Sequence, residues 1–236
     1  MNQTKAKIFL QEDRGHHEDD HARTYSHFRY GDDHRDHKSP FGRLYLLNED
    51  TLAPKQDIRM SAEHDSMLIL LPLVGELEIS RDRQPASPVR PRQLYVCFLN
   101  KGDTIRLHNP YPEDLVNYIQ AWVRTPNGVV KGPARVCDFD IVNRQNQLIE
   151  LDTCHQEKSF SDAGIYIGRF QGRAEAIHRL PPRYQGCFLF VIQGAFEAAG
   201  RLLHPRDGLA LWDLDEVDFE ALSNDAILLV LDVVLD

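Results

Sequence analysis

The sequence contains no apolar run that approaches the ~20 residues of a membrane-spanning helix, and residues 1–10 have no apolar core of a secretory signal. Cysteine is scarce, and no two cysteines have the C-x-x-C spacing of a zinc ribbon or a redox motif. A disulfide framework is equally unsupported. These absences predict a soluble protein of a reducing compartment, which we expect to be cytoplasmic. The 4 cysteines are Cys97, Cys137, Cys154 and Cys187.

Positive charge is also in deficit, with 27 Lys and Arg against 36 Asp and Glu and a net charge of −9. Nucleic acids and anionic membranes attract basic surfaces, so we expect neither as a partner. No nucleophile elbow, phosphate-binding glycine loop or basic stripe with interleaved aromatic residues is present. The 236 residues, 42% of them hydrophobic, are enough to bury a core without disulfides or metals.

No long segment has the 3.6-residue period of an amphipathic helix, whereas short apolar or alternating segments bounded by Gly, Pro, Asn and Asp recur throughout. This pattern favours an all-β sandwich or barrel. Pro72 inside one segment indicates an edge or a bulge, and residues 139–151 fit either a helix or an irregular stretch. The expected strands are 41–47, 67–74, 76–80, 93–99, 104–108, 117–123, 164–170, 174–180, 187–193, 209–212, 217–222 and 227–233.

The chain contains an internal repeat. Residues 70–80 (LLPLVGELEIS) resemble residues 189–199 (LFVIQGAFEAA), and each copy has an apolar strand, a glycine and an alternating strand. A turn with Gly and Asp follows each copy, at 101–103 and 206–208, and two more predicted strands come after it. Two tandem units of this kind predict duplicated antiparallel β-barrels. With residues 124–136 as a polar linker, we expect one domain over 1–130 and a second over 131–236.

Residues 11–40 hold six of the 11 histidines. A histidine-rich tract is a candidate metal site, but irregular spacing does not define a ligand geometry. We favour a solvated loop or covering strap, although His21 or His27 would supply a ligand if the segment covered the mouth of the first barrel. The six residues are His16, His17, His21, His27, His34 and His37.

Several segments spread over the chain are similar to motifs of the pirin family, whose bacterial members include quercetinase-like enzymes. The most specific is FGRL-x-x-LNED-x-LAP over 41–54, which resembles G-x-L-R-V-x-N-E-D-x-V-x-P. The resemblance implies an all-β bicupin, made of two tandem antiparallel, jelly-roll-like cupin β-barrels. The other matching segments are RG at 14–15, the S-F-x-x-Y-x-D-like stretch at 25–32, LVG at 73–75, QAWV at 120–123 and DGLALWD at 207–213.

The resemblance also implies an iron site in the first barrel, built from an H-x-H on one strand and an H-x-E on a later one. Histidines at i and i+2 of a strand point to one face, and imidazole plus carboxylate suits ferrous iron. Counting from Gly75 and Gly102 places other residues at these four positions: Ser61, Glu63, Leu107 and Asn109. Only Glu63 is a strong ligand type. We therefore expect no metal, and a pocket at these positions.

A rearranged metal site remains an alternative. Glu63, His64 and His108 would form it if the register shifted by one residue. Adjacent residues of a regular strand point to opposite faces, so the trio requires a bulge. In the second half, His178 and His204 are isolated histidines, for which a structural role is more common than ligation.

Three functional hypotheses follow. The first is a pirin-like bicupin with a degenerate metal site that needs no cofactor and acts as a small-ligand-binding or regulatory module, with an unknown small molecule in the N-terminal barrel. The alternative is a quercetin 2,3-dioxygenase-type oxidoreductase using Fe(II) or another divalent transition metal at a rearranged site. The third is a metal-free isomerase or lyase with Glu63 as a base beside Arg59 or His64. Exposed barrel edges are compatible with a monomer or a homodimer.

Overall fold

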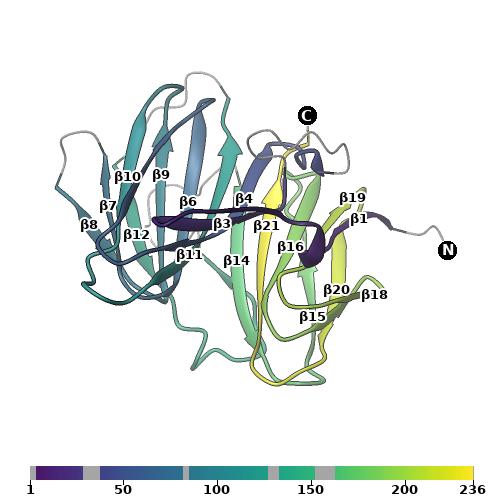
Figure 1. Cartoon of the computed structure of the whole chain (residues 1–236). Coiled ribbons are helices and arrows are strands. Elements are labelled where there is room, and N and C mark those ends of the chain that lie inside the picture. The colour runs from purple at the N-terminus through teal and green to yellow at the C-terminus, as the bar shows by residue number, and fades with distance from the viewer. Residues whose placement is uncertain (1–3, 29–37, 82–84, 127–132, 152–162, 236) are drawn as a thin grey trace. The chain divides into compact units, whose positions relative to one another are not determined.

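The computed structural model describes residues 4–28, 38–81, 85–126, 133–151 and 163–235. Within these ranges the chain is all-β, as the sequence predicts (Figure 1). The described helical structure is one 3-10 turn, η1 (Gln11–Asp13). The strands form four antiparallel sheets in two compact units. We call these units the N-terminal barrel (Gly15–Pro40 and Leu44–Phe139) and the C-terminal barrel (Met1–Arg14, Phe41–Arg43 and Asp140–Asp236).

The N-terminal barrel has a seven-stranded sheet of order β12-β9-β6-β11-β4-β3-β2 and a four-stranded sheet of order β5-β10-β7-β8. Apolar side chains of both sheets pack into one core, which includes Leu68, Leu107 and Trp122. The strands are β2 (Gly15–Glu18), β3 (Ala22–Ser26), β4 (Leu44–Leu52), β5 (Asp57–Ser61), β6 (Ser66–Val74), β7 (Leu77–Arg81), β8 (Ser87–Val89), β9 (Gln93–Leu99), β10 (Thr104–His108), β11 (Val116–Arg124) and β12 (Arg135–Asp138).

The C-terminal barrel has a six-stranded sheet of order β1-β19-β16-β21-β14-β13 and a four-stranded sheet of order β15-β20-β17-β18. Its core contains four aromatic residues, Tyr166, Phe170, Phe196 and Phe219. The strands are β1 (Lys5–Phe9), β13 (Ile149–Glu150), β14 (Ala163–Phe170), β15 (Glu175–Arg179), β16 (Gly186–Gln193), β17 (Phe196–Ala198), β18 (Arg201–Leu203), β19 (Gly208–Trp212), β20 (Glu216–Ala221) and β21 (Ala226–Val233).

The first residues of the chain do not lie in the N-terminal barrel, unlike the predicted domain over 1–130. Strand β1 pairs antiparallel with β19, so Lys5–Phe9 forms an edge of the second barrel. Phe9 is buried and its ring lies 5.5 Å from that of Phe188. Phe41 also contacts Phe188, with ring centroids 6.3 Å apart. The sequence of β1, KAKIF, alternates over too few residues to predict a strand or its partner.

The internal repeat is present in the backbone. The glycine between the repeated strands has a left-handed conformation in both copies, with φ of 77° at Gly75 and 75° at Gly194. Each copy also has a bulge two residues before that glycine. The pairing of β6 with β11 leaves out Leu73, and the pairing of β16 with β21 leaves out Ile192. Pro72 lies beside the first bulge, beyond the residues of β6 that pair with β9, and bulges are among the positions where a sheet tolerates proline.

Candidate functional site

Two of the four family metal positions lie outside the core of the N-terminal barrel. Along β5, Ile58 and Met60 pack against the core, and Ala62, just after the strand, is buried in it. Ser61 and Glu63 alternate with these residues and are exposed. Because alternate residues of a strand point to opposite faces, the side chains at the H-x-H positions point away from the core.

The other two positions are buried, but neither presents a free ligand atom. Leu107 is fully buried in the core, opposite Ile58. The Asn109 amide nitrogen donates to the carbonyls of Leu52, Ala53 and Asp114 at 2.8–3.1 Å, and its oxygen accepts from the Tyr111 N–H at 2.9 Å. Asn109 therefore ties the loop after β10 to the end of β4.

The alternative trio is not assembled, which corrects that hypothesis. His108 lies opposite Asp57, whereas Ser61 lies opposite Thr104 at the other end of β5. Four residues of extended strand separate those ends by about 13 Å, and Glu63 lies beyond Ser61. His64 packs its ring edge-on against Tyr45, with centroids 5.4 Å apart. No group of three or more His, Cys, Asp or Glu side chains that could hold a metal occurs in the described residues.

The described histidines of the N-terminal segment are dispersed. His16 stacks on Tyr25 with ring centroids 4.8 Å apart, and His17 is exposed. His21 Nδ1 lies 2.8 Å from Gln56 Oε1, and His27 is buried just after β3. His34 and His37 lie outside the described residues.

The interior of the N-terminal barrel carries a polar cluster that sequence reasoning did not identify as a site. Asn48 and Asp50 on β4 lie opposite Gln120 and Tyr118 on β11, on the face that carries Leu52 and Trp122 into the core. The Gln120 amide donates to the Asp50 carboxylate, and Trp122 Nε1 donates to Gln120 Oε1 at 2.7 Å. The NED and QAW motifs, which carried the family resemblance, thus meet inside the barrel.

Burial controls the charge of Asp50. Its side chain is 1% exposed, and desolvation raises the pKa of its carboxyl to about 6, against hydrogen bonds from Thr24 and Gln120 that lower it. Glu49 raises the pKa further by repulsion, and no cationic group of the described residues contributes. The carboxylate is therefore ionised at neutral pH, and the described part of the chain supplies no cation that compensates it.

The C-terminal barrel contains a buried histidine–aspartate pair. His178 on β15 and Asp232 on β21 are 5% and 0% exposed, and His178 Nε2 lies 2.8 Å from Asp232 Oδ1. Desolvation raises the pKa of Asp232, while His178, Arg183 and Tyr166 oppose that shift. His178, expected to be isolated, is thus held by a carboxylate from the opposite sheet.

Neighbouring residues shape this pair. The Tyr166 ring packs edge-on against His178 with centroids 4.6 Å apart. A Cβ at Gly164, opposite Asp232, would lie 3.1 Å from the Asp232 Cβ and Oδ2 atoms, so glycine leaves room for the carboxylate. On the other side Cys187 lies opposite Asp232, and burial raises the pKa of its thiol.

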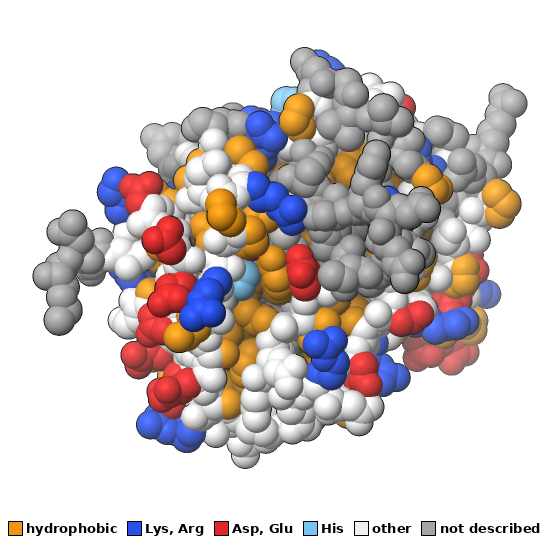
Figure 2. Space-filling view, turned by 180° about the vertical axis from the view of Figure 1, so that it is seen from behind, with side chains coloured by type: hydrophobic (Ala, Val, Ile, Leu, Met, Phe, Trp, Pro, Cys, Tyr) orange, Lys and Arg blue, Asp and Glu red, His pale blue; other side chains and the backbone are white. Residues whose placement is uncertain are grey.

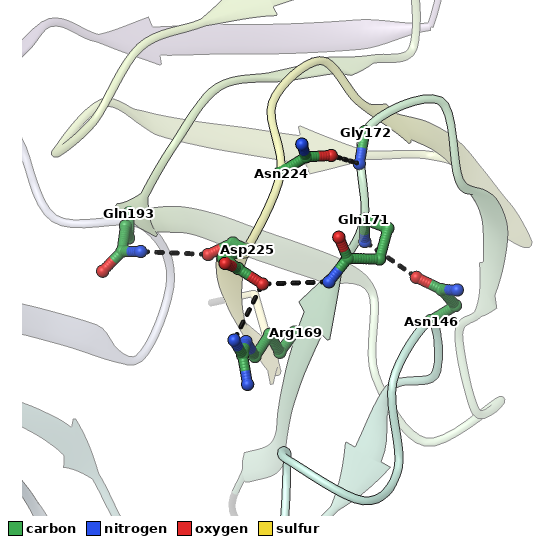
Figure 3. A network of polar contacts seen from close by, with 7 residues as sticks. All are labelled: Asn146, Arg169, Gln171, Gly172, Gln193, Asn224 and Asp225. Atoms are coloured by element: carbon green, nitrogen blue, oxygen red, sulfur yellow. Dashed lines mark hydrogen bonds and ion pairs between the residues drawn. The ribbon is translucent and has the colours of Figure 1, made fainter.

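A second polar network in the C-terminal barrel joins loops rather than forming a pocket. Figure 3 shows Asp225 between Arg169 and Gln171, whose side chains donate to it at 2.7 and 2.9 Å. Gln193 donates to the Asp225 carbonyl at 3.1 Å. These bonds keep the pKa of the Asp225 carboxyl below its usual range, with the bond from Gln171 as the largest cause. Each residue drawn makes at least one hydrogen bond to another member of the network, which indicates a structural role.

Acidic and basic side chains are interspersed on the face drawn in Figure 2, so this face has no large patch of a single charge. Among the described residues, no helix is long and apolar enough to cross a membrane.

Comparison with known proteins connects these features to a family. Residues 158–233 match a family model described as the quercetinase C-terminal cupin domain, and no curated protein sequence matches the chain. YhhW from Escherichia coli superposes with a TM-score of 0.84 at 17% identity, covering 98% of this chain and 99% of YhhW. A second YhhW structure, described as a bacterial pirin in complex with nickel(II), gives 0.83 at 17%, covering 98% and 100%.

A quercetin 2,3-dioxygenase from Acinetobacter baumannii superposes with a TM-score of 0.72 at 13% identity, covering 100% of this chain and 81% of the other. The chain therefore has the bicupin fold over its whole length. Its residues 158–233 also match the model of the quercetinase C-terminal cupin domain, so the chain is similar to the pirin and quercetinase-like bicupins in fold and, over this segment, in sequence.

Proposed function

We propose that this bicupin works without the iron site of its family, as a small-ligand-binding or regulatory module whose ligand occupies the N-terminal barrel. The observation that carries the proposal is the interior face of β5 and β10. The side chains that reach the core from these strands are Ile58, Met60, Ile105 and Leu107. Ile58, Ile105 and Leu107 have no atom that coordinates a metal ion, and the thioether of Met60 is a soft ligand that suits Cu(I) rather than ferrous iron.

The chemistry of the four family positions supports the same conclusion. Non-haem iron sites use imidazole and carboxylate ligands with open positions. Here the positions offer an alcohol, one exposed carboxylate, an aliphatic chain and an amide whose hydrogen bonds are already made. These residues do not fit an iron or nickel ion.

A quercetin 2,3-dioxygenase is the alternative, favoured by the family-model description and by the A. baumannii enzyme. An oxygen-electrode assay with quercetin, on protein loaded with Fe(II), Ni(II), Co(II) or Mn(II), separates the two functions. The proposal predicts no oxygen uptake above that of the free metal ions. Metal-dependent uptake that survives in a His16→Ala/His17→Ala/His21→Ala variant, which lacks three exposed surface histidines, would establish the dioxygenase instead.

A further inference from the structure

Two buried acceptor atoms inside the N-terminal barrel lack a hydrogen-bond partner among the described residues. They are Asn48 Oδ1 and Asp50 Oδ1. Their residues are 2% and 1% exposed and lie two positions apart on β4, so both side chains point to the same face. Buried polar atoms are nearly always paired, because an unpaired one loses its hydrogen bonds to water without replacement. Two such acceptors side by side therefore indicate a place for a donor.

The hydrogen bonds of the neighbouring described residues do not reach these two acceptors, so a ligand could supply the donor. Trp122 donates to Gln120, and Gln120 donates to Asp50, so these two donors of β11 are engaged. The hydroxyl of Tyr118, which lies opposite Asp50 on the same face, bonds neither of the two acceptors. From β3, Thr24 lies opposite Asp50 and Ser26 lies opposite Asn48. Thr24 lowers the pKa of Asp50 through a hydrogen bond, yet Asp50 Oδ1 remains without a partner.

The negative charge of the Asp50 carboxylate favours a positively charged donor. A buried carboxylate is stable when a cation or several hydrogen bonds compensate it. Among the described residues, the charged group that acts on Asp50 is Glu49, of the same sign. Within this part of the chain, the carboxylate and its neighbour therefore lack both a positive charge and N–H donors.

We propose that the N-terminal barrel binds a small organic cation whose N–H groups donate to Asp50 and Asn48. Residues two apart on a strand are separated by roughly 7 Å, which suits a ligand with more than one N–H, such as an ammonium or guanidinium compound. A hard metal ion is the other source of positive charge for these oxygens. The inference rests on the proposed function in placing the ligand in the same barrel.

The experiment is a ligand titration followed by amide chemical shifts of the full chain at pH 8. The probes are methylammonium, 1,4-diaminobutane and methylguanidine chlorides, with potassium, calcium and magnesium chlorides as separate arms. Asp50→Asn removes the charge and keeps the shape, whereas Glu49→Gln makes the same change on the opposite face of the same strand. Asn48→Ala tests the second acceptor.

We expect at least one amine to shift β3, β4 and β11 amides saturably, with affinity at least 10-fold weaker in Asp50→Asn and unchanged in Glu49→Gln. Saturation by a metal ion alone, equal effects of both variants, or no saturable amine shift would overturn the inference. The titration and the oxygen-uptake assay have independent outcomes. Dioxygenase activity would contradict the proposed function, but it would not show whether Asp50 and Asn48 bind a cation.

Discussion

At the scale of single residues, Asp50 links burial to the pH dependence of stability. Its pKa is about 6 in the folded chain, against 3.8 for an ordinary aspartate, so the folded state binds more protons between these pH values. The free energy of unfolding should therefore fall as pH rises from about 4 to about 6, by about 3 kcal/mol from this residue. Asp50→Asn should lose this component, which urea unfolding of both proteins at pH 4–8 measures. Parallel pH profiles would contradict it.

His178 and Asp232 give a second prediction at this scale. Aligning the two copies of the repeat by Gly75 and Gly194 places Met60, Leu68 and Trp122 of the N-terminal barrel at the positions of His178, Cys187 and Asp232. The barrel fold therefore accepts apolar residues there.

His178→Met leaves the Asp232 carboxyl buried without its partner, and should lower the free energy of unfolding by about 3–5 kcal/mol. The double variant His178→Met/Asp232→Leu removes both polar groups and should recover most of that loss. Guanidinium unfolding of the single and double variants gives the coupling energy. Additive losses would show that the pair does not act as a unit.

At the scale of elements, each copy of the repeat depends on a glycine with a left-handed backbone between its two strands. Gly194 has φ 75°, and a Cβ there would lie 2.4 Å from Ser223 Oγ and 2.8 Å from Ala226 Cβ. Gly194→Ala adds this overlap to the left-handed strain of about 1–2 kcal/mol, so we expect a loss of about 3 kcal/mol. Gly200→Ala is the control, because φ is 70° but no atom lies within 4 Å. In thermal unfolding, the midpoint temperature of Gly194→Ala should be clearly lower than that of Gly200→Ala. Equal losses of stability would show that the overlap of the added Cβ with Ser223 and Ala226 has no effect.

Element prediction from the sequence succeeded where strands are apolar on at least one face. Residues 93–99 and 104–108 match β9 and β10 at both ends. The strands that the sequence did not predict are β1, β2, β3, β5, β8, β12 and β18. All of them except β3 lie at a sheet edge, where short segments with polar side chains give a weak pattern. The undecided stretch 139–151 consists of turns and the short β13.

The site was less predictable than the strands. Leu107 and Asn109 were identified as replaced ligands, but spacing alone could not show that Ser61 and Glu63 lie on the outer face of β5. The motifs that contain Asn48, Asp50 and Gln120 could be recognised in the sequence by their resemblance to pirin motifs. Their contact could not be predicted, because it depends on the pairing of β4 with β11, which are far apart in the sequence.

At the scale of the whole molecule, strand β1 at the start of the sequence pairs with β19 and so belongs to the C-terminal barrel. We therefore expect a change in β1 to destabilise that barrel. Phe9→Ala removes a buried ring that contacts Phe188 and should cost about 3–5 kcal/mol. Hydrogen exchange followed by mass spectrometry should then rise in β16, β19 and β21, with β9 and β10 unchanged. Faster exchange confined to the N-terminal barrel would instead support a domain boundary near residue 130.

The central proposal is that this bicupin works without the iron site that its resemblance to the pirins implies, and metal content tests it most directly. Untagged full-length protein, expressed with iron, nickel and zinc supplied, is analysed by inductively coupled plasma mass spectrometry beside a Glu63→Ala/His108→Ala variant. The account predicts clearly substoichiometric metal that is the same in both proteins. About one tightly held transition-metal ion per chain, lost in the variant, would contradict it.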